Sequence, residues 1–193
     1  RELIEKAFRF ANEAHRDMYR NSGEPYIIHP INVARIVNQE IGLGAKSVSA
    51  ALLHDVVEDT GIPLEEISKH FGPKIASLID GLTKISGTYN KETNSLQAEN
   101  FRKMLMTLSD DFRVILVKIA DRLHNMRTLD SMPEYKRMKI AGETVYLYAP
   151  LAHRLGLFAI KTELEDLSFK FRHPRIYDEI ARKVKMDKKK NLA

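Results

Sequence analysis

The 193-residue sequence contains no cysteine. A disulfide framework and a thiolate zinc site are therefore excluded, and any bound metal ion must be held by histidine nitrogens and carboxylate oxygens. The absence of cysteine suits a reducing compartment, and we expect a cytoplasmic protein.

Long apolar runs are absent as well. No stretch approaches the roughly 20 residues that cross a membrane, and Arg1-Glu2-Leu3 does not begin a signal peptide, so we expect no membrane partner. The sequence has no internal repeat, no P-loop and no G-x-G-x-x-G motif. It also lacks an initiator methionine, from which we expect a piece of a longer protein.

The residues that are present have the mixture of an ordinary globular protein, with 44% apolar and 30% charged residues. The formal net charge of +5 favours a polyanionic ligand, although the lysines of residues 185–190 supply much of the excess. We expect no nucleic-acid partner for this part of the chain.

Apolar residues recur at helical spacing along most of the chain, and no segment is predicted to be a strand. We therefore expect an all-α protein of about ten helices, with a domain over residues 1–155 and further helices of the same domain over residues 156–193. The first helix is predicted to end near Tyr19. The second is predicted to begin at Pro30, which leaves His29 in a non-helical position at its mouth. Further helices are predicted over residues 47–60, up to Phe71, over residues 73–82, from Asn94, over residues 133–153 and 157–171, and from Pro174.

Two segments are less regular. Residues 84–94 are polar, contain glycine and show no periodicity, so we predict a loop that is a candidate for closing over a ligand. Residues 113–129 begin with the β-branched composition of a buried strand, but their length and later apolar spacing favour one long helix.

The stretch from Ala50 to Thr60 concentrates ionisable residues among apolar ones. In a continuous helix, His54, Asp55, Glu58 and Asp59 project into one arc of about 140°. Three carboxylates so close repel one another and stay ionised only beside a cation, which favours a metal site. The alternative is a helix edge exposed to solvent, where charged residues are ordinary.

A second polar stripe is predicted on the helix over residues 113–129. Asp121, Asn125 and Thr128 stand at i, i+4 and i+7 and are interpreted either as the lining of a cavity or as structural hydrogen-bonding residues. Asp121 also completes a candidate ligand set in the order H…HD…D, whose members are His29, His54, Asp55 and Asp121. Such a set suits Mn²⁺, Fe²⁺ or Mg²⁺ better than a closed structural zinc site, although zinc stays an alternative.

That order resembles the HD-domain superfamily of metal-dependent phosphohydrolases. Four stretches resemble, more specifically, the hydrolase half of the RelA/SpoT alarmone proteins: R-N-S-G-E-P-Y-I-I-H-P (residues 20–30), A-L-L-H-D-V-V-E-D-T (51–60), K-I-A-D-R-L-H-N-M-R-T-L (118–129), and the run from Y-A-P-L-A-H-R-L-G to K-T-E-L-E-D-L-S-F (148–169). The resemblance implies an all-helical HD fold, with residues 1–155 as the hydrolase domain and residues 156–193 as a connector.

The resemblance also implies an activity: manganese-dependent removal of the 3′-pyrophosphate from guanosine tetraphosphate or pentaphosphate, giving GDP or GTP plus pyrophosphate, in the stringent response. By position, the implied metal ligands are His29, His54, Asp55 and Asp121. Glu58 and Asp59 match the pair that acts on the nucleophilic water. The implied nucleotide contacts are Arg20, Asn21, Ser22, Asn125 and Thr128.

The proton donor for the leaving 3′ oxygen stays open among His124, Lys118, Arg122 and Lys84, and the last three are also candidate phosphate contacts. Arg122 and Arg127 have the alternative of pairing with helix carboxylates, and His124 that of a structural hydrogen bond. The remaining histidines, at positions 15, 70, 153 and 173, are expected to be structural or surface residues. The chain departs from the family pattern at Asp17-Met18, often Gly-Gln, and at Asn21, often lysine, so base stacking by Asn21 is an open point.

Two other functions stay open: an HD phosphohydrolase acting on another nucleotide, and a non-catalytic module that binds the alarmone. The resemblance further implies synthetase and regulatory domains in the full-length protein.

Overall fold

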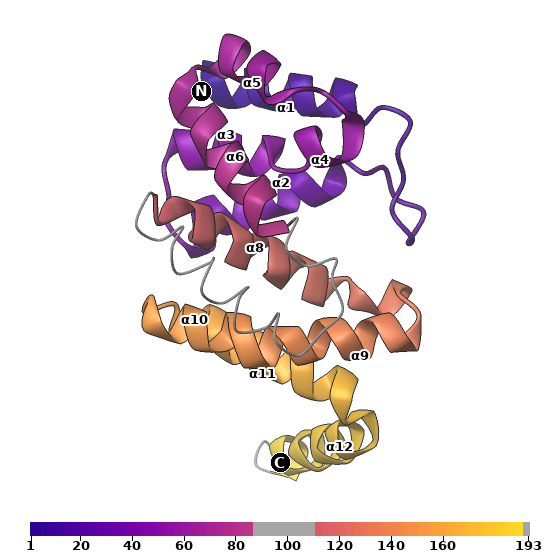
Figure 1. The fold of residues 1–193 in the computed structure, drawn as a ribbon. Helices are drawn as coiled ribbons and strands as arrows, with labels where there is room; N and C mark the ends of the chain where they lie inside the picture. The colour runs from indigo at the N-terminus through magenta and orange to yellow at the C-terminus, as the bar shows by residue number, and fades with distance from the viewer. Residues whose placement is uncertain (87–110, 191–193) are drawn as a thin grey trace. The chain divides into compact units, whose positions relative to one another are not determined.

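The computed structural model describes residues 1–86 and 111–190, and this part of the chain is helical and contains no strand (Figure 1). Its only β-type pairing is an isolated bridge between Tyr19 and Pro25. The all-α expectation is therefore confirmed. The chain divides into two compact units, residues 1–124 and residues 125–193.

The first unit is built around α3, which packs against α1, α2 and α6. Small residues dominate α3, and every residue from Ser47 to Leu53 is buried, so its neighbours approach it on several sides. The described helices of this unit are α1 (Glu2–Ala14), α2 (Ile28–Arg35), its π-helical continuation η1 (Ile36–Glu40), α3 (Ala45–Leu53), α4 (Val56–Thr60), α5 (Leu64–Phe71), α6 (Pro73–Ser86) and all but the last turn of α8 (Arg113–Arg127).

The first helix ends at Ala14, five residues before the predicted end at Tyr19. Beyond it the backbone pairs across a tight turn, with Tyr26 N–H bonded to the Met18 carbonyl and Arg20 N–H to the Glu24 carbonyl. Gly23, with φ of +86°, permits that turn. This cross-turn pairing takes the backbone groups that a longer helix would have used.

The second helix begins at Ile28, so the predicted start at Pro30 is wrong and His29 lies inside its first turn. A proline in the first turn lacks only an N–H that has no partner within the helix, so Pro30 is tolerated there. The side chain of His29 is consequently held on a helix rather than on a loop.

The helix predicted as continuous over residues 47–60 is divided in two, because regular helical structure is interrupted by a turn at His54–Asp55 and resumes as α4, although both residues keep right-handed helical dihedrals. The ring nitrogen Nδ1 of His54 lies 2.8 Å from the Ala51 carbonyl oxygen. That side-chain bond competes with the backbone for the same acceptor. His54 therefore directly follows α3, and Asp55 directly precedes α4.

The ambiguous segment is one helix, α8, as its length and later periodicity predicted. Its β-branched start is buried at Val114, Ile115 and Val117, which explains the strand-like composition without a strand. Asp111, two residues before the helix, accepts a hydrogen bond of 3.1 Å from the backbone N–H of Arg113, the first residue of α8.

In the second unit α11 packs against α9, η3, α10 and α12. The predicted helix over residues 133–153 is present as a helical run that contains a π-helical turn. The remaining two predicted helices correspond to α11 and α12. The elements are η2 (Leu129–Ser131), α9 (Glu134–Glu143), η3 (Thr144–Tyr148), α10 (Ala149–Arg154), α11 (Phe158–Arg172) and α12 (Pro174–Lys190).

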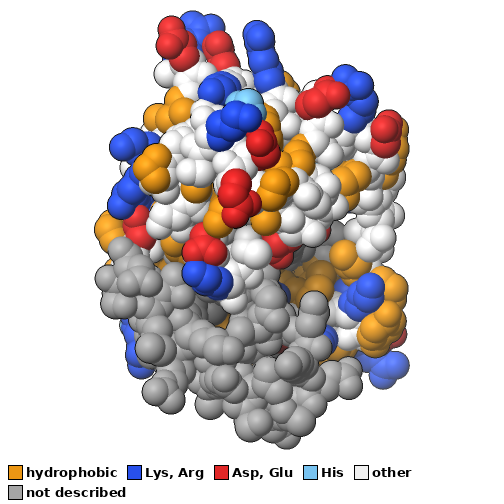
Figure 2. Space-filling view, turned by 45° about the horizontal axis from the view of Figure 1, so that its top comes forward, with side chains coloured by type: hydrophobic (Ala, Val, Ile, Leu, Met, Phe, Trp, Pro, Cys, Tyr) orange, Lys and Arg blue, Asp and Glu red, His pale blue; other side chains and the backbone are white. Residues whose placement is uncertain are grey.

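The predicted loop over residues 84–94 lies outside the described residues except for its first three, which belong to α6. The helix predicted from Asn94 lies wholly outside them. None of the described helices is long and apolar enough to cross a membrane. On the face drawn in Figure 2, basic and acidic side chains are intermixed.

Candidate metal centre

The two histidines of the predicted set meet in the first unit. His29 comes from the first turn of α2, and His54 directly follows α3, which packs against α2. Both side chains are buried, at 2% and 1% exposure. The alternative that the Ala50–Thr60 stretch is a solvent-exposed helix edge therefore does not hold at His54.

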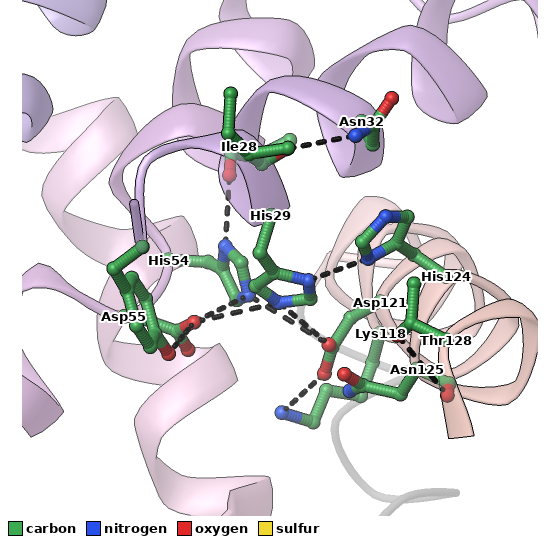
Figure 3. A network of polar contacts seen from close by, with 12 residues as sticks. Ile28, His29, Asn32, His54, Asp55, Lys118, Asp121, His124, Asn125 and Thr128 are labelled. Carbon is green, nitrogen blue, oxygen red and sulfur yellow. Dashed lines mark hydrogen bonds and ion pairs between the residues drawn. The ribbon is translucent and has the colours of Figure 1, made fainter. Parts of the chain in front are cut away.

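The carboxylates of Asp55 and Asp121 lie against the two imidazoles (Figure 3). His29 Nε2 is 3.2 Å from Asp121 Oδ1 and 3.6 Å from Asp55 Oδ2. His54 Nε2 is 3.1 Å from Asp55 Oδ2 and 3.8 Å from Asp121 Oδ1. The Nε2 atoms of both rings thus face the same two carboxylates.

The orientation of the His54 ring fits a metal ligand. Its Nδ1 is bonded to the Ala51 carbonyl, so Nδ1 carries the hydrogen and Nε2 is left to face the acids. Nε2 is buried and makes no hydrogen bond, despite its distance of 3.1 Å from Asp55. An imidazole fixed through Nδ1, with Nε2 turned to carboxylates, is the arrangement found where histidine binds a metal.

The ring of His29 is also fixed through its Nδ1 atom, but by a different partner. Its Nδ1 lies 2.8 Å from Nδ1 of His124, a residue of α8 that is 7% exposed. The two rings are 4.9 Å apart between centroids. His124 therefore lies behind His29, on the side away from the carboxylates.

Asp121 is tethered by a lysine on its own helix. Lys118 Nζ lies 3.0 Å from Asp121 Oδ2, while the other oxygen, Oδ1, faces the histidines. Burial raises the pKa of Asp121, but the Lys118 ammonium and the neighbouring rings of His29 and His54 outweigh it and hold that pKa well below its usual value. Asp121 is thus ionised at any physiological pH.

The hydroxyl of Tyr26 donates a hydrogen bond of 2.7 Å to Asp55 Oδ2, and it also contacts Asp59. Its ring stacks on His15, with centroids 4.8 Å apart. Burial, followed by the charge of Asp55, raises the pKa of Tyr26 far above its usual value, so the phenol remains a hydrogen-bond donor. Sequence reasoning missed Tyr26, which lies in the turn just before α2; its place three residues before His29 was the available signal.

Residues 7–158 match the model of the HD-domain family. The chain belongs to the HD-domain family. Membership and the donor set together imply a divalent metal ion: His29, His54 and Asp55 each offer one ligand atom, and these atoms lie within 4.8 Å of one another.

Curated relatives show a more specific likeness than membership of the HD-domain family. The chain is 49% identical, over 99% of its length, to a protein of Aquifex aeolicus named guanosine-3′,5′-bis(diphosphate) 3′-pyrophosphohydrolase. It is 47% identical over 94% of its length to the bifunctional (p)ppGpp synthase/hydrolase SpoT of Escherichia coli, and 47% identical over 98% to a GTP pyrophosphokinase of Myxococcus xanthus. The resemblance to the RelA/SpoT proteins is confirmed. The chain spans 25 to 27% of the length of these relatives.

A solved structure supports the fold. It is described as a metazoan ortholog of SpoT that hydrolyzes ppGpp, and it superposes with a TM-score of 0.66 at 24% identity. The match covers 89% of this chain and 96% of the other. The HD-type helical architecture expected from the sequence is therefore confirmed.

The acid pair of the HD domain, Glu58 and Asp59, lies on α4, which follows Asp55 directly. Both side chains are exposed, unlike the buried histidines. They belong to a separate helical element from His54, so the single helical face expected for the four residues stays a prediction. Asp59 is connected to the cluster through Tyr26 instead.

The remaining predicted contacts differ in their exposure. Asn21 and Ser22 are exposed in the turn after α1, and Arg20 is half-buried there. Lys84, also exposed, pairs with Asp80 at 2.6 Å. Arg122 is half-buried on α8, and Asn125 and Thr128 belong to the second unit, so their roles as nucleotide contacts stay predictions. Of the four histidines expected to be structural or surface residues, His15 is buried and the others, His70, His153 and His173, are exposed.

Proposed function

We propose that this HD domain is a metal-dependent 3′-pyrophosphohydrolase that converts guanosine tetraphosphate or pentaphosphate to GDP or GTP plus pyrophosphate. The observation that carries the proposal is the 49% identity, over 99% of the chain, to a protein named for that reaction. The meeting of His29, His54, Asp55 and Asp121 supports it, because a phosphohydrolase of this kind needs a cation at that place.

We propose His29 and His54 as nitrogen ligands and Asp55 and Asp121 as oxygen ligands of the ion. Mixed nitrogen and carboxylate donors suit manganese, with Fe²⁺ or Mg²⁺ as alternatives. When bound, such an ion would withdraw charge from phosphate oxygens and make water easier to deprotonate.

Residues of the chain would carry out the proton transfers and the positioning. Glu58 or Asp59 would orient the attacking water and take its proton, and their exposure on α4 leaves them accessible to substrate and solvent. Water attacks the phosphorus bonded to the 3′ oxygen, and the bond between that phosphorus and the 3′ oxygen breaks. The 3′ oxygen leaves with a proton and pyrophosphate departs with the oxygen of water.

Substrate binding would draw on cationic and polar groups outside the cluster. We propose Arg20, Asn21 and Ser22 for the guanosine and Asn125 and Thr128 for the nucleotide. Lys84 and Arg122 are candidate phosphate contacts. Lys118 pairs with Asp121 at 3.0 Å, which favours a tethering role over a primary role in binding phosphate.

The reaction is tested by incubating purified protein with guanosine tetraphosphate and Mn²⁺, Mg²⁺ or Fe²⁺ in ¹⁸O-labelled water. We expect GDP and pyrophosphate, with the label in pyrophosphate, as read by ³¹P NMR and mass spectrometry. Asp121→Asn is the matched control for contaminating phosphatases. Release of two single phosphates, label in GDP, or no turnover with any of the three metals would contradict the proposal.

A second function is favoured by one observation: the relative that is 47% identical over 98% of this chain carries the name GTP pyrophosphokinase. That name describes pyrophosphate transfer and not hydrolysis. The second candidate function is therefore a non-catalytic module that binds the alarmone. Binding of guanosine tetraphosphate without turnover, unaffected by Glu58→Gln, would select the module. Comparable turnover of deoxynucleoside triphosphates or cyclic nucleotides would instead select an HD phosphohydrolase of another substrate.

A further inference from the structure

The contact between His29 and His124 joins two ring nitrogens, Nδ1 to Nδ1, at 2.8 Å. Both side chains are buried, at 2% and 7% exposure. A hydrogen bond between two imidazole nitrogens needs a hydrogen on one of them and a lone pair on the other. Only one of the two rings can be the donor.

The far side of His29 decides the direction. Its Nε2 faces Asp121 Oδ1 at 3.2 Å and Asp55 Oδ2 at 3.6 Å. A metal ligand binds through a lone pair, and a neutral imidazole with its lone pair on Nε2 carries its hydrogen on Nδ1. His29 must then be the donor and His124 the acceptor. The opposite direction puts the hydrogen of His29 on Nε2 and closes that nitrogen to a metal ion.

His54 provides an internal comparison. It also points Nδ1 away from the carboxylates and Nε2 towards them, but its Nδ1 donates to the Ala51 carbonyl at 2.8 Å. A backbone carbonyl is always an acceptor. The acceptor behind His29 is a side chain, so a single substitution can remove it.

We propose that His124 is a positioning residue that accepts a hydrogen bond from His29 Nδ1 and thereby holds Nε2 of His29 ready for the metal ion; this rests on the proposed metal-dependent function. His124 touches neither substrate nor ion in this role. With Nδ1 already used as an acceptor, His124 is not the proton donor to the leaving oxygen through that nitrogen.

The test compares Mn²⁺ dissociation constants of the wild type with those of His124→Leu and His124→Asn, measured by calorimetry without substrate. Outer partners of metal-binding histidines typically contribute about 10- to 100-fold in metal affinity. We expect His124→Leu to weaken binding by about that factor. His124→Asn should stay close to wild type, because the amide oxygen of asparagine can occupy the place of Nδ1. His70→Leu, at an exposed ring in α5, is the control and should bind as the wild type does.

A spectroscopic readout accompanies the affinities. In protein labelled with ¹⁵N-histidine and loaded with diamagnetic Zn²⁺, the Nδ1 of His29 should carry the hydrogen and that of His124 should not. A hydrogen on Nε2 of His29, unchanged affinity in His124→Leu, or equal losses in the Leu and Asn variants would each overturn the inference. Failure of the wild type itself to bind metal would instead overturn the proposed function. Thermal melts of each variant confirm that folding is intact.

Discussion

At the scale of single residues, the carboxylates of this site differ in what surrounds them. Asp55 and Asp121 lie against two buried imidazoles, whereas Glu58 is exposed on α4. A carboxylate held against buried imidazoles is suited to binding a metal ion with them, and an exposed carboxylate is suited to transferring protons to and from water. Their substitution should therefore have separable consequences.

Asp55→Ala and Asp121→Ala should each lose metal and activity together, because each removes an oxygen ligand. Glu58→Gln should retain metal while the turnover rate falls by about 10² to 10⁴, the usual contribution of a general base. Metal content after dialysis and kcat at saturating metal distinguish the two outcomes. Equal loss of metal in all three variants would erase the division between ligands and proton-transfer residues.

Tyr26→Phe should show how far the cluster depends on its outer partners. It removes the 2.7 Å hydrogen bond to Asp55 and the contact with Asp59 while the ring can still stack on His15. We expect a stability loss of about 1.5 kcal/mol and a metal affinity about tenfold weaker. Urea unfolding and calorimetry measure these. Tyr135→Phe, at an exposed tyrosine of α9, is the matched control, and an effect of similar size there would contradict the interpretation.

Metal binding should release a proton from His54. Burial lowers the pKa of His54, but the negative charge of Asp55 and the nearby carboxylate of Asp121 outweigh it and raise that pKa to about 10. Burial lowers the pKa of His29, which is neutral at pH 7. Near neutral pH, metal must therefore displace one proton, and affinity should rise about tenfold per pH unit up to pH 10.

Calorimetry in two buffers of different ionisation enthalpy measures this proton count. A binding enthalpy that is independent of the buffer at pH 7 would show that His54 is already neutral, and the prediction would fail.

At the scale of elements, α6 and α8 approach each other closely at one glycine. A Cβ added to Gly81 would lie 2.9 Å and 3.2 Å from the two methyl carbons of Val114, a β-branched side chain with little freedom to move. Gly142 on α9 has nothing within 4 Å of its added Cβ. The two helical glycines are thus a matched pair.

Gly81→Ala should destabilise the protein by about 1 to 2 kcal/mol, because overpacking exceeds the gain in helix propensity. Gly142→Ala should stabilise it by about 0.5 to 1 kcal/mol through propensity alone. Thermal or urea unfolding measures both. Adding Val114→Ala should reduce the cost of Gly81→Ala; if the two changes are simply additive, the proposed close approach is not its cause.

At the scale of the whole molecule, the formal charge of +5 bears on the capture of a highly charged nucleotide. Acidic and basic side chains are intermixed on the face drawn in Figure 2, and a net charge of +5 over 193 residues gives a modest long-range attraction. It should be screened by salt at the distances where substrate first approaches.

We expect kcat/KM for guanosine tetraphosphate to fall as ionic strength rises from about 0.05 to 0.5 M, mainly through KM. The kcat at saturating substrate should change little, since the buried ion pairs are screened weakly. Steady-state kinetics at fixed free Mn²⁺ measure this, with inhibition by uncharged guanosine as the control. A fall confined to kcat would place the salt effect at the buried cluster.

Much of the fold followed from local pattern. Helical periodicity located α5, α6 and α8, because burial of one helix face repeats every turn. It also predicted no strand, and the described residues contain none. The misplaced boundaries have local chemical causes that periodicity does not contain. Cross-turn backbone pairing ended α1 early, and the bond from His54 to the Ala51 carbonyl divided the predicted third helix.

The sequence by itself determined the kinds of metal donor, the helical class and the family resemblance, because these depend on residue identity and spacing. Only the tertiary structure decided which atoms face each other: Tyr26 on Asp55, Lys118 on the outer oxygen of Asp121, and His124 behind His29. Such pairings join residues up to 95 positions apart and arise when helices pack, so no local pattern encodes them.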